Sequence, residues 1–234
     1  MNTAEAKQLM LKYLMPKIES RGFKTPGKSS EFQIKRKTKN GEDVISGGFT
    51  DFNPVQKIVY GAGKRDKRII DILLQIQEKG ITLSPPINKN SSTLGISYER
   101  IHKLNYIGYL PEMETEADVE KCVNMMLEFL EGTAFPMLDK FEDLREIDRI
   151  INGDEPWDTD WEKSFLLGAY FNFSRLVIAR LSGNEKYEDL IEFTYSTLER
   201  RSKESGHPFT YDREDMNKPL PALIKVLEDI KPQY

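Results

Sequence analysis

The chain has 234 residues, of which 38% are hydrophobic and 31% charged, and its net charge at neutral pH is -4. This composition excludes a disordered chain, and no apolar run reaches the roughly 20 residues that span a bilayer. The single cysteine, Cys122, excludes an internal disulfide and disfavours a cysteine-rich metal site. A lone thiol without a signal-peptide pattern indicates a reducing compartment, so we expect a cytoplasmic protein.

The small net charge conceals two regions of opposite charge. Residues 1–70 hold 15 Lys and Arg against 7 Asp and Glu, a net of +8. Residues 111–165 hold 5 against 17, a net of -12. The favoured interpretation is that the two regions face each other or tile a mixed surface, and the alternative is that one of them binds a partner of opposite charge.

The first predicted element is a helix. Asn2, with Glu5 three positions later, forms a capping-box pattern, and apolar residues follow at helical spacing as far as Ile18. Pro16 lies inside that pattern and predicts a kink or an early end. Gly22 is expected to stop the helix.

The region after this helix has the alternation of β-strands. Asn40-Gly41 is a strong hairpin signal between two such segments. Further elements are expected in chain order: a strand over 55–60, a helix over 66–79, a loop over 84–92, a strand over 94–98 and a partner strand over 104–110.

From residue 111 the apolar pattern is helical almost to the end of the chain. A short connection at residues 182–184 predicts an antiparallel pair of helices. The expected fold class is therefore α+β. An N-terminal helix and a small antiparallel sheet with packed helices are expected over residues 1–110, and a mostly helical region over 111–234. A single core shared by the two regions is compatible with this pattern.

The most suggestive local pattern is glycine-rich and basic, and it joins the predicted strand to the predicted helix. A glycine turn at such a junction would let backbone N–H groups approach an anion. The pattern matches neither a Walker A loop nor a dinucleotide-binding loop, so a turn with solvated charges is favoured over an anion or nucleic-acid site. The residues of that alternative site are Gly61, Gly63, Lys64, Arg65, Lys67 and Arg68.

A second distinctive segment is acidic and holds both tryptophans. Acidic residues suit the start of a helix, whose dipole they complement, and this interpretation is favoured. The alternative is an exposed partner-binding site made by Trp157, Asp158, Asp160 and Trp161. Asp158 and Asp160 could also offer oxygens to a divalent cation, although a calcium loop needs more ligands.

The sequence shows no reactive constellation. His102 and His207 lie far apart, outside any zinc-binding spacing, and no G-x-S-x-G elbow is present. Cys122 falls on the apolar stripe of a predicted helix, which favours a buried, inert thiol. We therefore expect no catalytic residue, no metal and no cofactor.

Two short stretches resemble an uncharacterised bacterial family of α+β domains of unknown function. They are Leu-Met-Pro-Lys-Ile at 14–18, leading to Gly-Phe-Lys at 22–24, and Phe-Pro-Met-Leu-Asp-Lys at 135–140. The resemblance covers residues 4–150. It implies a helix, an antiparallel sheet and trailing helices, and some proteins of this type resemble the immunity proteins of bacterial toxin systems. It transfers no catalytic residue.

The expected function is non-enzymatic binding of another protein, with an immunity-like or sequestration role as its most specific form. The first alternative is an anion or nucleic-acid binding module using residues 61–68, and the second is a metal-dependent hydrolase. Nucleic acid is thus a less favoured partner than protein, and no membrane partner is expected. The sequence does not indicate an oligomeric state.

Overall fold

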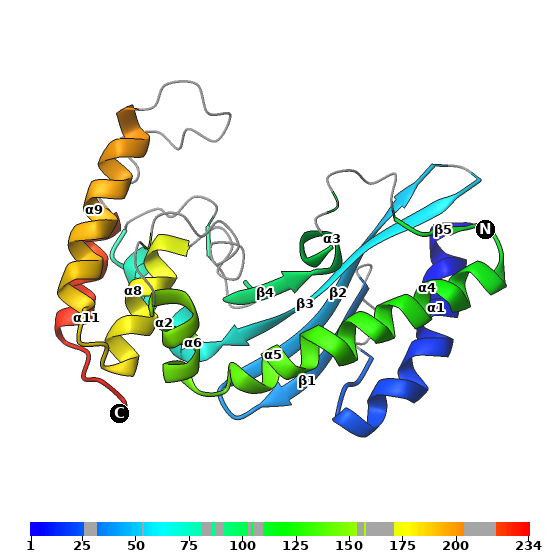
Figure 1. The fold of residues 1–234 in the computed structure, drawn as a ribbon, viewed down its shortest axis with the longest axis horizontal. Helices are drawn as coiled ribbons and strands as arrows, with labels where there is room; N and C mark the ends of the chain where they lie inside the picture. Colours follow the sequence, from blue (N-terminus) through cyan, green and yellow to red (C-terminus); the bar gives the residue numbers. More distant parts are fainter. Residues whose placement is uncertain are drawn as a thin grey trace. The chain divides into compact units, whose positions relative to one another are not determined.

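The computed structural model has an N-terminal helix, a small antiparallel sheet and further helices, so the chain is an α+β protein as predicted (Figure 1). The residues that the structure describes are 1–25, 32–52, 54–80, 86–87, 91–102, 104, 110–153, 157, 171–203 and 219–234.

The chain forms two compact units, each assembled from two separate segments. Unit 1 comprises Met1–Arg65 and Gly95–Lys140, and unit 2 comprises Asp66–Leu94 and Phe141–Tyr234. This grouping differs from the predicted division at residue 110. The reason is that helix α4 (Glu116–Phe129) packs against helix α1 (Thr3–Ile18) and so belongs with the N-terminal region.

Helix α1 begins as its sequence predicts. The Asn2 side chain accepts a hydrogen bond from the Glu5 N–H, and the Glu5 carboxylate accepts one from the Asn2 N–H, each over 2.9 Å. The helix continues past Pro16 to Ile18, so the expected early end at Pro16 is wrong. Gly22, with a φ of +83°, ends the short helical turn that follows.

The sheet of unit 1 has the strand order β1-β2-β3-β4, with β5 also paired to β3. The bounds are β1 Phe32–Thr38, β2 Gly41–Asp51, β3 Gln56–Asp66, β4 Leu94–Ser97 and β5 Glu112–Met113. Thr38 pairs with Gly41, so Lys39 and Asn40 make the connection between β1 and β2. The predicted hairpin is confirmed, with its turn one residue earlier than expected.

Helices cover one face of this sheet and close the core of unit 1 (Figure 1). The predicted apolar stripe of α4 is buried: Val119, Cys122, Val123 and Met126. Phe135 contacts Phe23 with ring centroids 5.4 Å apart, which fixes the following helix beside the end of α1. The shorter helices of this unit are η1 (Glu19–Arg21), α3 (Tyr98–Ile101), η3 (Leu130–Ala134) and α5 (Phe135–Lys140).

Unit 2 is built from helices. They are α2 (Lys67–Glu78), α6 (Leu144–Asn152), α8 (Phe171–Ser182), α9 (Tyr187–Lys203) and α11 (Pro219–Glu228). Helix α8 packs against α2, α6, α9 and α11, and almost all of its residues are buried. Gly183, with a φ of +75°, turns the chain from α8 into α9, which confirms the predicted helix pair. Most of the loop predicted over 84–92 and of the strand predicted over 104–110 lies outside the described residues.

Candidate functional site

The basic stretch that was expected to form a glycine turn is part of a strand. Strand β3 continues through Gly61 and Gly63 to Asp66, which is the N-cap of α2. A Cβ atom at Gly61 would lie 2.5 Å from the carbonyl oxygen of Ile96, so this glycine permits a close approach of the backbone of β4. The prediction of a loop at this position is therefore wrong.

The first two charged residues of this stretch are buried and paired within the fold. Lys64 is only 1% exposed, and its Nζ lies 2.8 Å from Oδ1 of the fully buried Asp43. The other oxygen of Asp43 accepts hydrogen bonds from Arg36, at 2.6 Å from Nη2 and 3.0 Å from Nε. Arg65 lies 3.2 Å from the Glu42 carboxylate. These cations already have anionic partners.

The last two charged residues of the stretch lie at the start of α2. Arg68 folds back onto the N-cap, and its Nε donates to Asp66 over 2.9 Å. The side chain of Lys67 is exposed. Anion binding by residues 61–68 stays a prediction, and the internal pairing of Lys64, Arg65 and Arg68 disfavours it.

Of the predicted tryptophan-centred partner site, Trp157 is described, whereas Asp158, Asp160 and Trp161 lie outside the described residues. The indole of Trp157 is partly buried. Its Nε1 donates to the Asn152 carbonyl over 2.9 Å, and its ring meets that of Phe193 edge-on at 5.5 Å. Trp157 is thus tied to α6 and α9 within unit 2, and its role in partner binding stays a prediction.

A surface not identified from the sequence lies at one end of unit 1, where α1, β3 and β5 begin. Met113 of β5 pairs with Gln56 of β3, and the Thr3 hydroxyl donates to Gln56 Oε1 over 2.8 Å. These contacts bring the start of α1 beside the carboxylates that precede and open α4. We call this surface the acidic end and define it by Glu5, Phe52, Glu112, Glu114 and Glu116.

Phe52 supplies the acidic end with an exposed aromatic ring. It follows β2, and its N–H donates to the Val55 carbonyl over 2.8 Å, so a tight turn presents its side chain, which is 52% exposed. Lys57 lies over the ring at 5.6 Å and pairs with Glu112 at 3.0 Å. The aromatic ring is thereby linked to the carboxylates.

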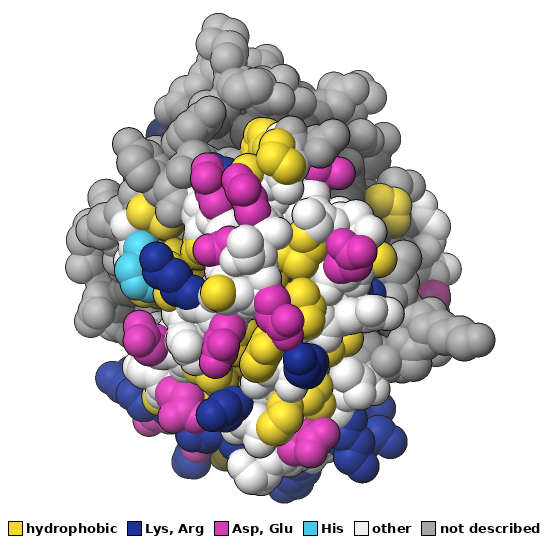
Figure 2. Space-filling view, turned by 90° about the vertical axis from the view of Figure 1, so that its right-hand side faces the viewer, with side chains coloured by type: hydrophobic (Ala, Val, Ile, Leu, Met, Phe, Trp, Pro, Cys, Tyr) yellow, Lys and Arg dark blue, Asp and Glu magenta, His cyan; other side chains and the backbone are white. Residues whose placement is uncertain are grey.

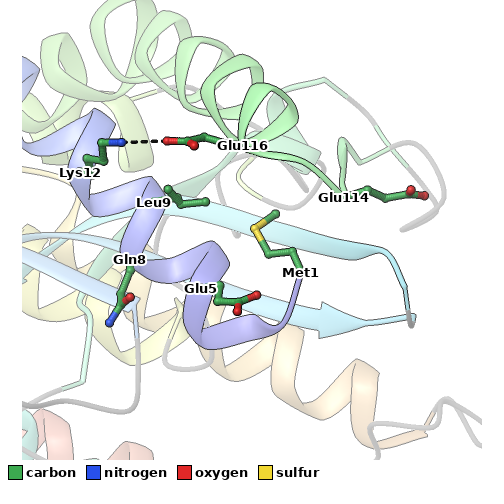
Figure 3. A pocket seen from close by; sticks show the side chains of 7 residues that line it. All are labelled: Met1, Glu5, Gln8, Leu9, Lys12, Glu114 and Glu116. Atoms are coloured by element: carbon green, nitrogen blue, oxygen red, sulfur yellow. Dashed lines mark hydrogen bonds and ion pairs between the residues drawn. The ribbon is translucent and has the colours of Figure 1, made fainter.

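A hollow of about 500 Å³ adjoins these carboxylates (Figure 3). Its lining comes from α1 and from the segment that opens α4: Met1, Glu5, Gln8, Leu9, Lys12, Glu114 and Glu116. Met1 and Leu9 provide apolar surface, and three carboxylates provide negative charge. Figure 2 looks onto this end of the unit and shows acidic side chains distributed between apolar ones, with Lys and Arg side chains on the same face.

One carboxylate of the hollow is already held by neighbouring groups. Glu116 Oε1 accepts hydrogen bonds from Lys12 Nζ at 2.8 Å and from the Tyr13 hydroxyl at 2.7 Å. These hydrogen bonds lower the pKa of Glu116 and raise the pKa values of both donors. Glu114 forms no ion pair within the part of the chain that the structure describes, so its charge faces solvent.

In the part of the chain that the structure describes, the groups that could perform chemistry form no metal-binding cluster. Cys122 is buried, as predicted, and burial raises the pKa of its thiol to about 12. Among the described residues, no three potential metal ligands come together. Over the same residues, no helix has both the length and the apolar character needed to cross a bilayer.

Comparison with protein-family models, with curated proteins and with solved structures finds no match to this chain. The net charge of -12 over 111–165 was the sequence signal that could have identified the acidic end. The contributions of Phe52 and α1 depend on pairing between distant segments.

Proposed function

We propose that this protein binds another protein that has a basic surface, and that the acidic end of unit 1 makes the contact. The observation that supports this proposal is the exposed ring of Phe52 beside the carboxylates of the acidic end. A sequestration or immunity-like role is its most specific form, because occupying the surface of a basic protein requires no catalytic group on this chain.

The composition of the surface fits such a partner. Residues 111–131 hold seven Asp and Glu against one Lys, and this excess would attract a cationic protein and accelerate its association. Large aromatic side chains such as Phe52 contribute most of their binding free energy when they enter a pocket of the partner. The apolar surface of Met1 and Leu9 can accept the aliphatic part of a lysine or arginine side chain, whose charged end then meets Glu114.

The anion-binding alternative has less support. Two of its cations would have to exchange ion-pair partners for a ligand, because Lys64 pairs with the buried Asp43 and Arg65 with the partly buried Glu42. Separating such a buried pair leaves an uncompensated charge at a cost of several kcal/mol. A basic protein at the acidic end requires no such exchange.

The test compares capture of partners from a bacterial extract by the wild type, Phe52→Ser and Glu112→Gln/Glu114→Gln. We expect one basic protein bound in stoichiometric amount by the wild type. Its affinity, measured afterwards with the purified partner, should fall about tenfold or more in Phe52→Ser. The carboxylate variant should mainly slow association and lose salt dependence.

Glu188→Gln/Glu192→Gln on α9 is the matched control, because it removes the same charge from exposed positions of unit 2 and should bind normally. Equal capture by all variants would contradict the acidic end as the contact. Recovery of nucleic acid at low salt, without any protein, would favour the basic N-terminal region instead.

A further inference from the structure

Arg175 of α8 is a buried guanidinium whose hydrogen bonds are incomplete. The side chain is 1% exposed, and its Nε donates to Asn152 Oδ1 over 3.1 Å. Nη2 reaches the Ile151 carbonyl only at 3.5 Å, which is the outer limit of a hydrogen bond. Nη1 is buried and has no hydrogen-bond partner among the described residues.

Aromatic side chains flank this guanidinium, and none of the described residues forms an ion pair with it. Its Cζ lies over the rings of Phe171 at 5.0 Å and Phe193 at 5.3 Å. Burial therefore lowers the pKa of Arg175 to about 10. A buried charge in such a setting is stable only when an anion or several strong acceptors compensate it.

The carboxylate of unit 2 that acts on this charge is already engaged elsewhere. Asp148 Oδ1 accepts from the Asn152 amide at 2.7 Å, and Oδ2 accepts from the Asn184 amide at 2.7 Å. Asp148 thus raises the pKa of Arg175 through its charge, without a hydrogen bond to it. The edge of the guanidinium that carries Nη1 and Nη2 is left for another acceptor.

We propose that Arg175 binds a small carboxylate through Nη1 and Nη2. This site lies in unit 2 and is independent of the proposed protein-binding surface in unit 1. Two parallel N–H donors match the two oxygens of a carboxylate, and one negative charge compensates one guanidinium. A phosphate would bring further charged oxygens among aromatic rings that offer no donors, so a carboxylate fits better.

The aromatic side chains beside this site reach the surface of the described part of unit 2. Phe171, Phe193 and Trp157 are each partly exposed, and two of them contact the guanidinium directly. Rotation of one of these rings would admit an anion of the size of formate or acetate.

The test is a titration of the wild-type protein with sodium formate and sodium acetate, followed by tryptophan fluorescence and by thermal unfolding. Asn152 links the site to the indole, since it bonds Arg175 through Oδ1 and Trp157 through its carbonyl. We expect a saturable fluorescence change and a rise in Tm with formate or acetate, and neither with chloride at equal ionic strength.

Two substitutions at Arg175 and one control separate the site from a general salt effect. Arg175→Met should abolish the response, and Arg175→Lys, which keeps the charge without the two-pronged donor, should weaken it about tenfold. Arg149→Met on the exposed side of α6 should respond as the wild type does.

The absence of a saturable response in the wild type would overturn the proposal, whatever the stability of the variants. An unchanged response in Arg175→Met would overturn it as well. A response to inorganic phosphate that equals or exceeds the response to formate would overturn the assignment to a carboxylate.

Discussion

The two units treat buried positive charge differently. In unit 1, Lys64 and Arg36 share the carboxylate of Asp43, and Arg36 also reaches Asp139 at 3.0 Å. In unit 2, Arg175 is as deeply buried as Lys64. Its hydrogen-bond acceptors among the described residues are neutral: the amide oxygen of Asn152 and, at 3.5 Å, the carbonyl of Ile151. A compensated buried charge connects strands and helices, whereas an uncompensated one keeps the capacity to bind an anion.

The largest expected effect tests the compensated cluster. Asp43→Asn preserves the shape of the side chain but removes the negative charge shared by the buried Lys64 and the partly buried Arg36. We expect a loss of about 3–5 kcal/mol in the free energy of unfolding, measured by urea denaturation, because the buried Lys64 loses its anionic partner and Arg36 keeps only the exposed Asp139.

Asp139→Asn is the control for that prediction, since it removes the exposed partner of Arg36. Its side chain is 58% exposed, so the loss should stay below about 1 kcal/mol. If Asp43→Asn were as mild as this control, the cluster would not be the buried, mutually dependent set of charges described for unit 1.

The exposed pair of Asp143 and Arg145 is expected to have an effect between those of the buried charges of the two units. Asp143, the N-cap of α6, accepts from the backbone N–H of Arg145 at 2.9 Å and from its guanidinium Nη2 at 2.8 Å. These hydrogen bonds lower the pKa of Asp143 to about 2, and the bond from the guanidinium has the larger effect. Because folding lowers this pKa, the ionised Asp143 stabilises the fold fully at pH values above its ordinary pKa of 3.8. That contribution disappears as the pH falls toward about 2.

Asp143→Ala should therefore cost about 1 kcal/mol at pH 7. The difference from the wild type should shrink as the pH is lowered from about 4 to about 2. Urea denaturation at several pH values measures both quantities. Asp229→Ala, at an exposed position after α11, should show neither effect. A cost that did not change with pH would show that the ionised carboxylate is not the stabilising group.

The smallest effect is expected for Arg175→Met. Replacing a buried, uncompensated cation by an apolar side chain of similar length removes a desolvation cost and also one hydrogen bond to Asn152. We expect the free energy of unfolding to stay within about 1 kcal/mol of the wild-type value. A loss of 3 kcal/mol or more would show that Arg175 is compensated in solution, which would remove the contrast between the units and the basis for anion binding.

Local signals in the sequence predicted much of the fold. The capping box of Asn2 and Glu5, the hairpin at Asn40 and the buried stripe of α4 follow from residues within one turn or one strand of each other. The pairing of Gln56 with Met113 joins positions far apart in the chain, and no local pattern indicates it. The grouping of α4 with α1 was missed for the same reason.

The candidate sites were less predictable than the fold. Gly61, Gly63 and Lys64 have the composition of a loop, and they form a strand because Asp43 on the neighbouring strand compensates the lysine. A one-dimensional pattern of charge does not show which cation meets which carboxylate across a sheet. Arg175 gave no signal at all, since a single arginine in an apolar helix is common.

The positions of Cys122 and Trp157 provide a built-in probe for each unit. The only cysteine of the chain lies in the core of unit 1, and its thiol can react with a labelling reagent only when that core opens. Trp157 reports on the packing of unit 2. Equal free energies from thiol labelling and from tryptophan fluorescence would mean that the two units unfold as one cooperative block, and unequal values would rank them without any engineered label.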